Sequence, residues 1–185
     1  MGNRIKMSLI PDFAITSQRV MTQEGEREAA ILICGEKILD VISISEIPSD
    51  YPVEDMANDV VMPGLVDTHV HINEPGRTDW EGFETATKAA AAGGITTLVD
   101  MPLNCIPVTT TIDALNQKIA ATKNQLWMDC GFYGGLIPDN IHDFESLADA
   151  GILGFKAFLS HSGIDEFPNI LESHLREALP ILSKK

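Results

Sequence analysis

The sequence predicts an α/β fold, the first half of a TIM-type (β/α)8 barrel preceded by a smaller β-rich part. Before Met62 the chain consists of short runs that are rich in β-branched residues and separated by turns. After that point, nearly continuous apolar runs alternate with amphipathic stretches, which is typical of a parallel sheet covered by helices. Four such units fill residues 63–185 at about 31 residues each, whereas a closed barrel takes about 250 residues. We therefore expect two domains, 1–62 and 63–185, the second holding the first four βα units.

The β-rich part is expected to contain three strands. Residues 13–21 and 37–42 are rich in β-branched side chains, and residues 28–34 form an apolar run too continuous for a half-exposed strand. The pair Gly35-Glu36 supplies the turn between the second and third strands, which favours a hairpin.

In the barrel part, four apolar runs are predicted to form the parallel strands: 65–71, 95–101, 126–132 and 152–159. The helix after the first strand is expected to begin with a capping box at Thr78–Glu81 and to end at Gly93-Gly94. Apolar stripes at helical spacing predict three more helices, around 112–119, 143–150 and 171–179, the last ending before Pro180.

Charge and cysteine usage restrict the classes of partner and compartment. Acidic residues number 27 against 13 basic ones, a net charge of −14, which disfavours nucleic acid and anionic membranes as partners. The cysteines are odd in number and far apart, which disfavours a disulfide framework and is typical of a reducing compartment. The first residues lack the apolar stretch of a signal peptide, and no run approaches the roughly 20 residues of a membrane helix. The sequence therefore favours a soluble, cytoplasmic protein.

His69 and His71 form the sharpest chemical signal, in the run Asp67-Thr-His-Val-His71. Residues two apart in a strand share a face, so both imidazoles are expected to project together from the carboxyl end of the first barrel strand. Paired imidazoles bind zinc and similar divalent metals, and barrel enzymes build their sites at this end. The alternative is a pair of half-buried histidines whose ring nitrogens bond to backbone carbonyls.

Lys156 is the second signal, because it stands between aromatic residues in Phe155-Lys-Ala-Phe158. An ordinary charged lysine in such a strand would carry a large desolvation cost. Desolvation lowers the pKa of the amine and favours its neutral, nucleophilic form. The alternative is a lysine whose stem packs on the strand while its amine reaches solvent at the barrel rim.

Three stretches of the chain resemble the cyclic-amide branch of the amidohydrolase superfamily and, within it, the allantoinases: His69–Phe83, Asp100–Asn104 and Gly154–Gly163. The resemblance implies a metal-dependent hydrolase barrel and a small β-sandwich to which the leading segment contributes. It implies that Lys156 is carboxylated and, together with His69 and His71, holds two Zn²⁺ ions. The implied reaction is hydrolysis of the cyclic amide of allantoin to allantoate, in purine catabolism.

The resemblance also bears on three polar residues. Dihydroorotases generally carry arginine two positions after the second histidine, where this chain has Asn73, and an amide suits the neutral ureido group of allantoin. The alternative is that Arg77 serves as the clamp for an anionic substrate. Asn104 is a candidate substrate contact, with a turn-forming asparagine as the alternative. Asp67 is a candidate for orienting a ligand histidine from behind, or it caps a turn.

Other family features are expected beyond Lys185. The resemblance places two further histidine ligands on the fifth and sixth strands and a general-base aspartate on the eighth, so no catalytic residue is assigned within residues 1–185. It implies a homo-oligomer, usually a tetramer, for the full-length enzyme, and an inactive 185-residue chain. The alternatives are a dihydropyrimidinase (hydantoinase) or dihydroorotase, or a non-catalytic remnant that binds one metal weakly or associates with another chain.

Overall fold

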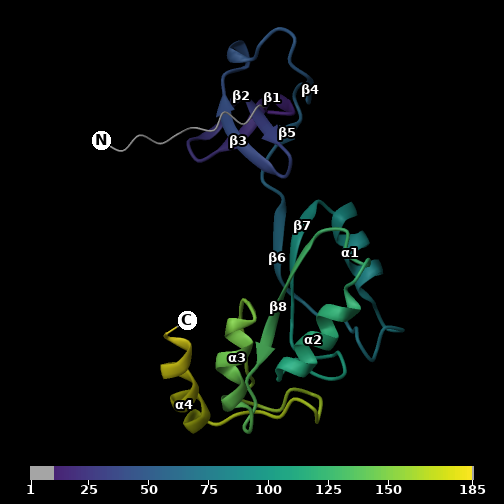
Figure 1. Cartoon of the computed structure of the whole chain (residues 1–185), viewed down its shortest axis with the longest axis vertical. Coiled ribbons are helices and arrows are strands. Elements are labelled where there is room, and N and C mark those ends of the chain that lie inside the picture. Colours follow the sequence, from purple (N-terminus) through teal and green to yellow (C-terminus); the bar gives the residue numbers. More distant parts are fainter. Residues whose placement is uncertain (1–10, 185) are drawn as a thin grey trace. The chain divides into compact units, whose positions relative to one another are not determined.

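The fold is that of a computed structural model, which describes residues 11–184. The chain divides into two compact units that meet between Pro63 and Gly64 (Figure 1). The opening residues that argue against a signal peptide lie outside the described range. Within it, every helix is too short or too polar to cross a lipid bilayer.

The first unit is a single β-sheet in the order β3-β2-β1-β4, with β5 also paired to β1. Strands β1 and β2 are antiparallel, as are β2 and β3, whereas β4 and β5 run parallel to β1. The three predicted strands are thus confirmed, and the two short edge strands are additions. The elements are β1 (Phe13–Thr22), β2 (Gly25–Cys34), β3 (Lys37–Ile42), a 3-10 turn η1 (Ile44–Glu46), β4 (Val53–Asp55) and β5 (Val60–Val61).

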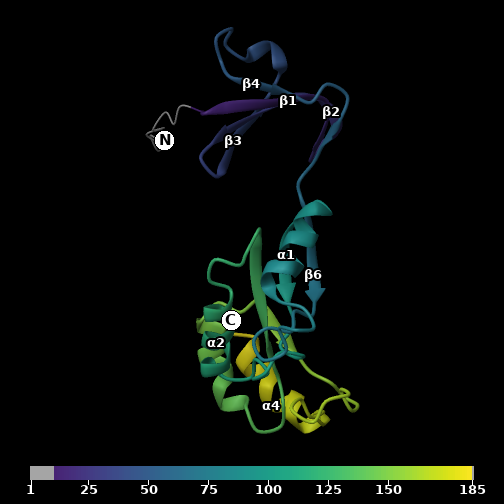
Figure 2. The same ribbon diagram turned by 90° about the vertical axis from the view of Figure 1, so that its right-hand side faces the viewer.

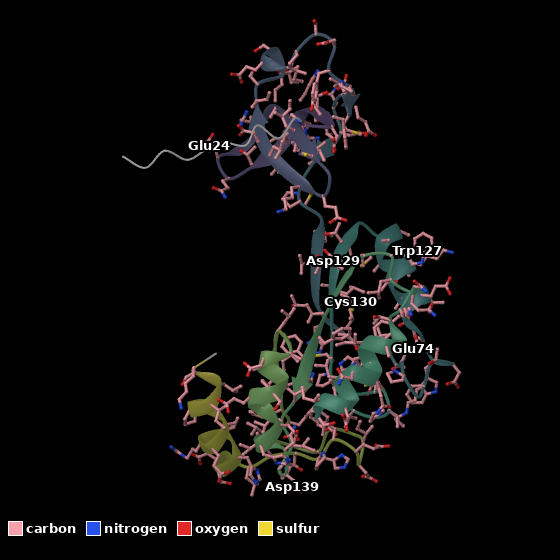
Figure 3. The ribbon with its side chains drawn as sticks, in the orientation of Figure 1. Glu24, Glu74, Trp127, Asp129, Cys130 and Asp139 are labelled. Carbon is pink, nitrogen blue, oxygen red and sulfur yellow. The ribbon has the colours of Figure 1, made fainter. Side chains whose placement is uncertain are left out.

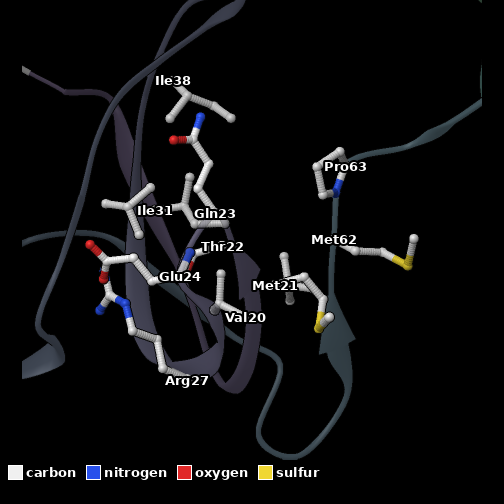
Figure 4. A pocket seen from close by; sticks show the side chains of 12 residues that line it. Val20, Met21, Thr22, Gln23, Glu24, Arg27, Ile31, Ile38, Met62 and Pro63 are labelled. Atoms are coloured by element: carbon white, nitrogen blue, oxygen red, sulfur yellow. The ribbon is translucent and has the colours of Figure 1, made fainter.

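One part of this sheet carries an apolar hollow (Figure 4). Its lining comes from β1, β2, β3 and the segment after β5, and includes Val20, Ile31 and Val41. Met21 and Ile38 beside them are 41% and 65% exposed, respectively. The β-rich unit therefore leaves large apolar side chains uncovered within the described residues.

The second unit is a four-stranded parallel sheet in the order β6-β7-β8-β9, which follows the order of the chain. Helices connect successive strands, and α3 contacts both α2 and α4 (Figures 1 and 2). This arrangement confirms the predicted half-barrel. Its elements are β6 (Leu65–Val70), α1 (Phe83–Ala92), β7 (Ile95–Asp100), α2 (Ile112–Ala121), β8 (Asp129–Gly135), a 3-10 turn η2 (Ile141–Asp143), α3 (Phe144–Asp149), β9 (Gly154–Lys156) and α4 (Glu172–Leu182).

Strand β8 begins three residues later than predicted and continues to Gly135. The apolar pair that suggested an earlier start, Leu126 and Trp127, is 38% and 58% exposed. The strand contains glycines instead, and side chains of neighbouring elements pack closely against them, in the space that a Cβ atom would take. A Cβ on Gly131 would lie 2.5 Å from the Leu153 side chain, and one on Gly135 would lie 2.4 Å from Phe167.

The predicted capping box at Thr78–Glu81 is wrong, because α1 begins at Phe83 and its N-cap is Gly82. The first turn takes its cap from further back in the chain. Glu74, labelled in Figure 3, accepts a hydrogen bond at Oε2 from the Phe83 N–H at 2.8 Å. A carboxylate at this position meets an unpaired backbone donor and the positive end of the helix dipole.

The expected end of the last helix before Pro180 is also wrong, since α4 continues to Leu182. Proline removes one backbone donor, so its cost falls on a single hydrogen bond near the end of the helix. The helix begins with a cap that the apolar stripe did not indicate: His174 Nδ1 accepts the Leu171 N–H at 3.0 Å.

Two buried clusters hold the barrel unit together near the strand ends. Ile72, Phe83 and Leu98 pack α1 against β6 and β7. Phe144 and Ile170 belong to a second cluster, and Phe144 also stacks on Phe155 of β9 with ring centroids 4.2 Å apart. Packing therefore fixes Ile72, directly after His71, and Phe155, directly before Lys156.

Candidate functional site

His69 and Lys156 meet at the carboxyl ends of the two outer strands of the parallel sheet. His69 Nε2 and Lys156 Nζ are 3.1 Å apart, although β6 and β9 are separated by two strands. Strands lie about 4.8 Å apart, so a flat sheet would place these two strands about 14 Å from each other. The contact therefore indicates a curved sheet, as in a barrel, with the two side chains on its concave side.

His71 lies just beyond the end of β6, and its ring is 5.3 Å from that of His69 at a tilt of 46°. Between Asp67 and Val70 the pairing of β6 with β7 is irregular, so the regular alternation of the strand does not account for this closeness. The prediction that the two imidazoles project together is confirmed. The predicted reason, regular alternation along the strand, is incomplete, because the pairing of β6 with β7 shifts register beside His69.

The surroundings lower the pKa of two of these groups. Burial lowers the pKa of His71, the positive charge of Lys156 lowers it further, and the backbone of Leu103 has a smaller opposite effect. Burial also lowers the pKa of Lys156. A neutral imidazole can donate its lone pair to a metal, and a neutral amine can act as a nucleophile.

The donor set fits a divalent metal. His71 Nδ1 is buried and has no hydrogen-bond partner among residues 11–184. The described part of the chain holds no group of three or more His, Cys, Asp or Glu side chains arranged around a metal position. Two imidazoles and Lys156 are what these residues offer, and a carboxylated lysine would add two oxygen donors.

The structure gives the other predicted site residues different surroundings. Asp67 Oδ1 accepts the backbone N–H of His69 at 3.0 Å, so its contact is with the main chain and not with the imidazole. Asn104 has a φ of 76°, a left-handed conformation that asparagine tolerates in turns, and its carbonyl accepts from Arg77 at 3.4 Å. Asn73 bonds through its backbone to Glu81 and Arg77. No hydrogen bond among the described residues joins either asparagine side chain to the two histidines or Lys156.

A buried ion pair beside the histidines has no counterpart in the sequence prediction. Lys118 of α2 and Asp100 at the end of β7 are both 0% exposed, with Nζ 2.5 Å from Oδ2. Burial raises the pKa of Asp100, and Lys118 opposes that shift. The only sequence signal was Asp100 itself, which lies in one of the stretches quoted for the resemblance. Nothing local indicated that a lysine 18 residues later would be its partner.

Cysteine chemistry plays no visible part in this site. Cys105 is buried and its thiol contacts the carbonyls of Pro102 and Pro107. Cys130 on β8, labelled in Figure 3, has a pKa raised to about 12, chiefly by burial.

We expect Cys130 to resist alkylation in the folded chain. At pH 8 its thiolate fraction is lower than that of a free cysteine, with pKa about 8.5, by about three powers of ten, and the thiolate is the reactive form. Iodoacetamide labelling followed by peptide mass spectrometry measures this rate, and the chain unfolded in urea is the control. Labelling of Cys130 at the same rate in folded and unfolded chains would contradict the expectation.

Comparisons with known proteins agree with the geometry. Residues 60–161 match the amidohydrolase family. The chain is 52% identical over 169 residues to an allantoinase of Streptomyces avermitilis, covering 91% of this chain and 38% of that protein. It is 45% identical to an allantoinase of Saccharomyces cerevisiae, covering 95% of this chain and 40% of that one. The chain thus spans about two fifths of the length of these relatives.

A solved structure shows the same fold. An L-hydantoinase (dihydropyrimidinase) from Arthrobacter aurescens superposes with a TM-score of 0.85 at 31% identity, covering 95% of this chain and 39% of that chain. The family match covers more than half of the residues, and the half-barrel and the paired histidines at a strand end agree with it. This chain belongs to the amidohydrolase family.

Proposed function

We propose that this chain provides part of the barrel and metal centre of an enzyme that hydrolyses the cyclic amide of allantoin to allantoate. The observation that carries the proposal is the meeting of Lys156 with His69, 3.1 Å apart, with His71 beside them. The chain is 45–52% identical to proteins named allantoinase, which supports the choice of substrate. Allantoin is thus the proposed small-molecule partner.

His69, His71 and Lys156 would hold the metal, for which we propose two Zn²⁺ ions. The amidohydrolase family is generally metal-dependent. Imidazole nitrogens and oxygen anions are both common zinc ligands. When bound, divalent ions polarise a carbonyl and lower the pKa of water toward neutrality. The chain's own part is to place the two imidazoles and Lys156 together and to keep His71 neutral.

Lys156 is proposed to act as its carbamate. Its neutral Nζ would attack the carbon of dissolved carbon dioxide and form an N–C bond, while one N–H proton passes to solvent. The product is an anion with two oxygens that can each bind a cation. The lowered pKa of Lys156, caused by burial, increases the fraction of neutral amine available for this step.

Asn73 supports allantoin over an anionic ring substrate. An amide side chain offers neutral donors and acceptors to a ureido group, whereas a ring carboxylate is best held by a cation. Asn73 lies two residues after His71, and we propose that its side chain contacts the substrate. A hydantoin or dihydropyrimidine ring is the second candidate, favoured by the structural similarity to the Arthrobacter aurescens L-hydantoinase.

Compartment and assembly complete the proposal. We propose a cytoplasmic homo-oligomer, a tetramer for the full-length enzyme. The odd, unpaired cysteines favour a reducing compartment. Cell fractionation with an antibody to the chain, and the mass of the purified protein by light scattering, would test the two statements separately.

Substrate preference tests the function. The protein encoded by the complete reading frame that contains this chain would be purified, loaded with zinc and bicarbonate, and assayed on allantoin, hydantoin, dihydrouracil and dihydroorotate. We expect the highest kcat/KM on allantoin and the lowest on dihydroorotate, because Asn73 gives the ring carboxylate no cation. Faster turnover of hydantoin or dihydrouracil would favour the second candidate, and preference for dihydroorotate would contradict both.

A further inference from the structure

We propose that the buried Asp100–Lys118 pair is a positioning device that holds the backbone on both sides of His71 and thereby keeps its imidazole beside that of His69. The proposal rests on the proposed function only for its consequence, which is metal binding. The geometric part concerns residues of the barrel unit alone.

Asp100 contacts the chain directly after His71. Its Oδ1 accepts the Ile72 N–H at 2.7 Å, while Oδ2 accepts from Lys118 Nζ at 2.5 Å. Both oxygens are therefore engaged, and Asp100 and Lys118 are 0% exposed. A buried carboxylate with two fixed partners has little freedom to turn, so the position of the Ile72 amide is fixed in turn.

A second hydrogen bond fixes the chain directly before His71. The Val70 carbonyl accepts the Met101 N–H at 2.8 Å, and Lys118 Nζ also donates to the Met101 carbonyl at 2.9 Å. Lys118 therefore bonds to two consecutive residues, Asp100 and Met101, each of which bonds to a neighbour of His71. This matters because β6 ends at Val70, and the regular ladder no longer determines where His71 points.

The Asp100–Lys118 pair lies among apolar side chains. Lys118 Nζ lies 5.9 Å from the centroid of the Phe132 ring, and Ile72 and Leu98 are buried in the adjacent cluster. Water does not compete for the donors of a fully buried ammonium. Replacing buried ion pairs by apolar residues of similar volume is often neutral or stabilising, so stability alone is a weak reason for such a pair. What an apolar pair cannot supply is an acceptor for the Ile72 N–H.

Two double variants separate positioning from stability. Asp100→Leu with Lys118→Met removes the charges and the acceptor, whereas Asp100→Asn with Lys118→Met removes the charges and keeps Oδ1. The exposed Lys123→Met serves as the matched control for loss of a lysine on the same segment. If the Leu/Met pair does not fold, Asp100→Val with Lys118→Leu provides a second variant without an acceptor.

The first readout needs no metal. In the labelled 185-residue chain, NMR measures exchange of the Ile72 amide and the NOE between the two imidazoles, whose centroids are 5.3 Å apart. We expect faster exchange and loss of the NOE in the Leu/Met variant and retention of both signals in Lys123→Met. In the Asn/Met variant, which keeps the acceptor for Ile72 but loses the Lys118 bonds, we expect partial retention. An unchanged NOE in a folded Leu/Met variant would overturn the proposal.

The second readout is the affinity for Co²⁺, followed by its visible absorption. Residues that support metal ligands typically change affinity about 10–100-fold when mutated. We expect such a loss in the Leu/Met variant and a smaller loss in the Asn/Met variant. If the unsubstituted full-length protein bound no Co²⁺ while the NMR results followed the expectation, the metal centre would be wrong and the positioning role would stand.

Discussion

Replacing Lys156 with methionine is expected to reduce allantoin hydrolysis by the full-length enzyme by more than about a hundredfold and to lower its zinc content. Even residues behind a metal ligand typically cost about 10–100-fold when changed, and Lys156 is proposed to be a ligand itself. Methionine keeps the apolar stem against the Phe158 ring, 5.0 Å from Nζ, and removes only the amine. Metal analysis by mass spectrometry and kcat on allantoin would be measured together.

Carbamate formation gives this prediction a direct signature. Protein equilibrated with ¹³C-bicarbonate should show a carbamate carbon resonance that is absent from Lys156→Met. Activity of the unsubstituted enzyme should fall when carbon dioxide is purged during metal loading and recover when bicarbonate is added. Lys123→Met, which removes an exposed lysine of the same unit, is the control. Full zinc content and activity in Lys156→Met would show that the residue is not a ligand.

Phe144→Ala is expected to destabilise the barrel unit by about 3–5 kcal/mol, the usual range for removing a buried aromatic side chain. Phe144 is 0% exposed, stacks on Phe155 and packs with Leu136 and Ile170. Its loss would leave a cavity between α3, β9 and the segment before α4. Whole domains are stable by only about 5–15 kcal/mol, so this one change is a large fraction of the total.

Urea unfolding followed by circular dichroism would measure the effect as a shift of the midpoint. Leu159→Ala is the control, because Leu159 is also a large apolar residue of the barrel unit but is 71% exposed. A change in the unfolding free energy of less than about 0.5 kcal/mol is expected there, as for most surface substitutions. Equal shifts for the two variants would show that Phe144 does not pack as described.

Strong local signals made much of the barrel unit predictable from sequence. The apolar run of β7 and the stripe of α2 gave elements close to their observed bounds, although only in β7 does the apolar run also coincide with the buried residues. The predicted range of β8 began three residues too early, because the apolar residues of this stretch are not its buried ones. Trp127 is exposed, while Gly134 and Gly135 are buried. Glycine carries no apolar signal, so a strand built on close packing over glycines is nearly invisible to pattern reasoning.

The site was predictable where residues were close in sequence and hidden where they were not. The two-residue spacing indicated His69 and His71, and the aromatic neighbours indicated Lys156. Lys118 did not, because a lysine on an amphipathic helix is normally exposed. The predicted stripe placed Ile119 inward, whereas Ile119 is 46% exposed and Lys118 is 0% exposed. Recognising the pair requires knowing that the end of β7 lies under α2, which is tertiary information.

The strictly sequential order of the parallel sheet determines when the site can form during protein synthesis. Each strand pairs with the one made just before it, so the sheet can grow from β6 to β9 as the chain leaves the ribosome. His69 is made 87 residues before Lys156, which corresponds to roughly 4–17 s at about 5–20 residues per second. The two histidines are therefore synthesised several seconds before the lysine that lies beside His69 in the folded chain, and the strand that carries them can pair with β7 before β9 has been made.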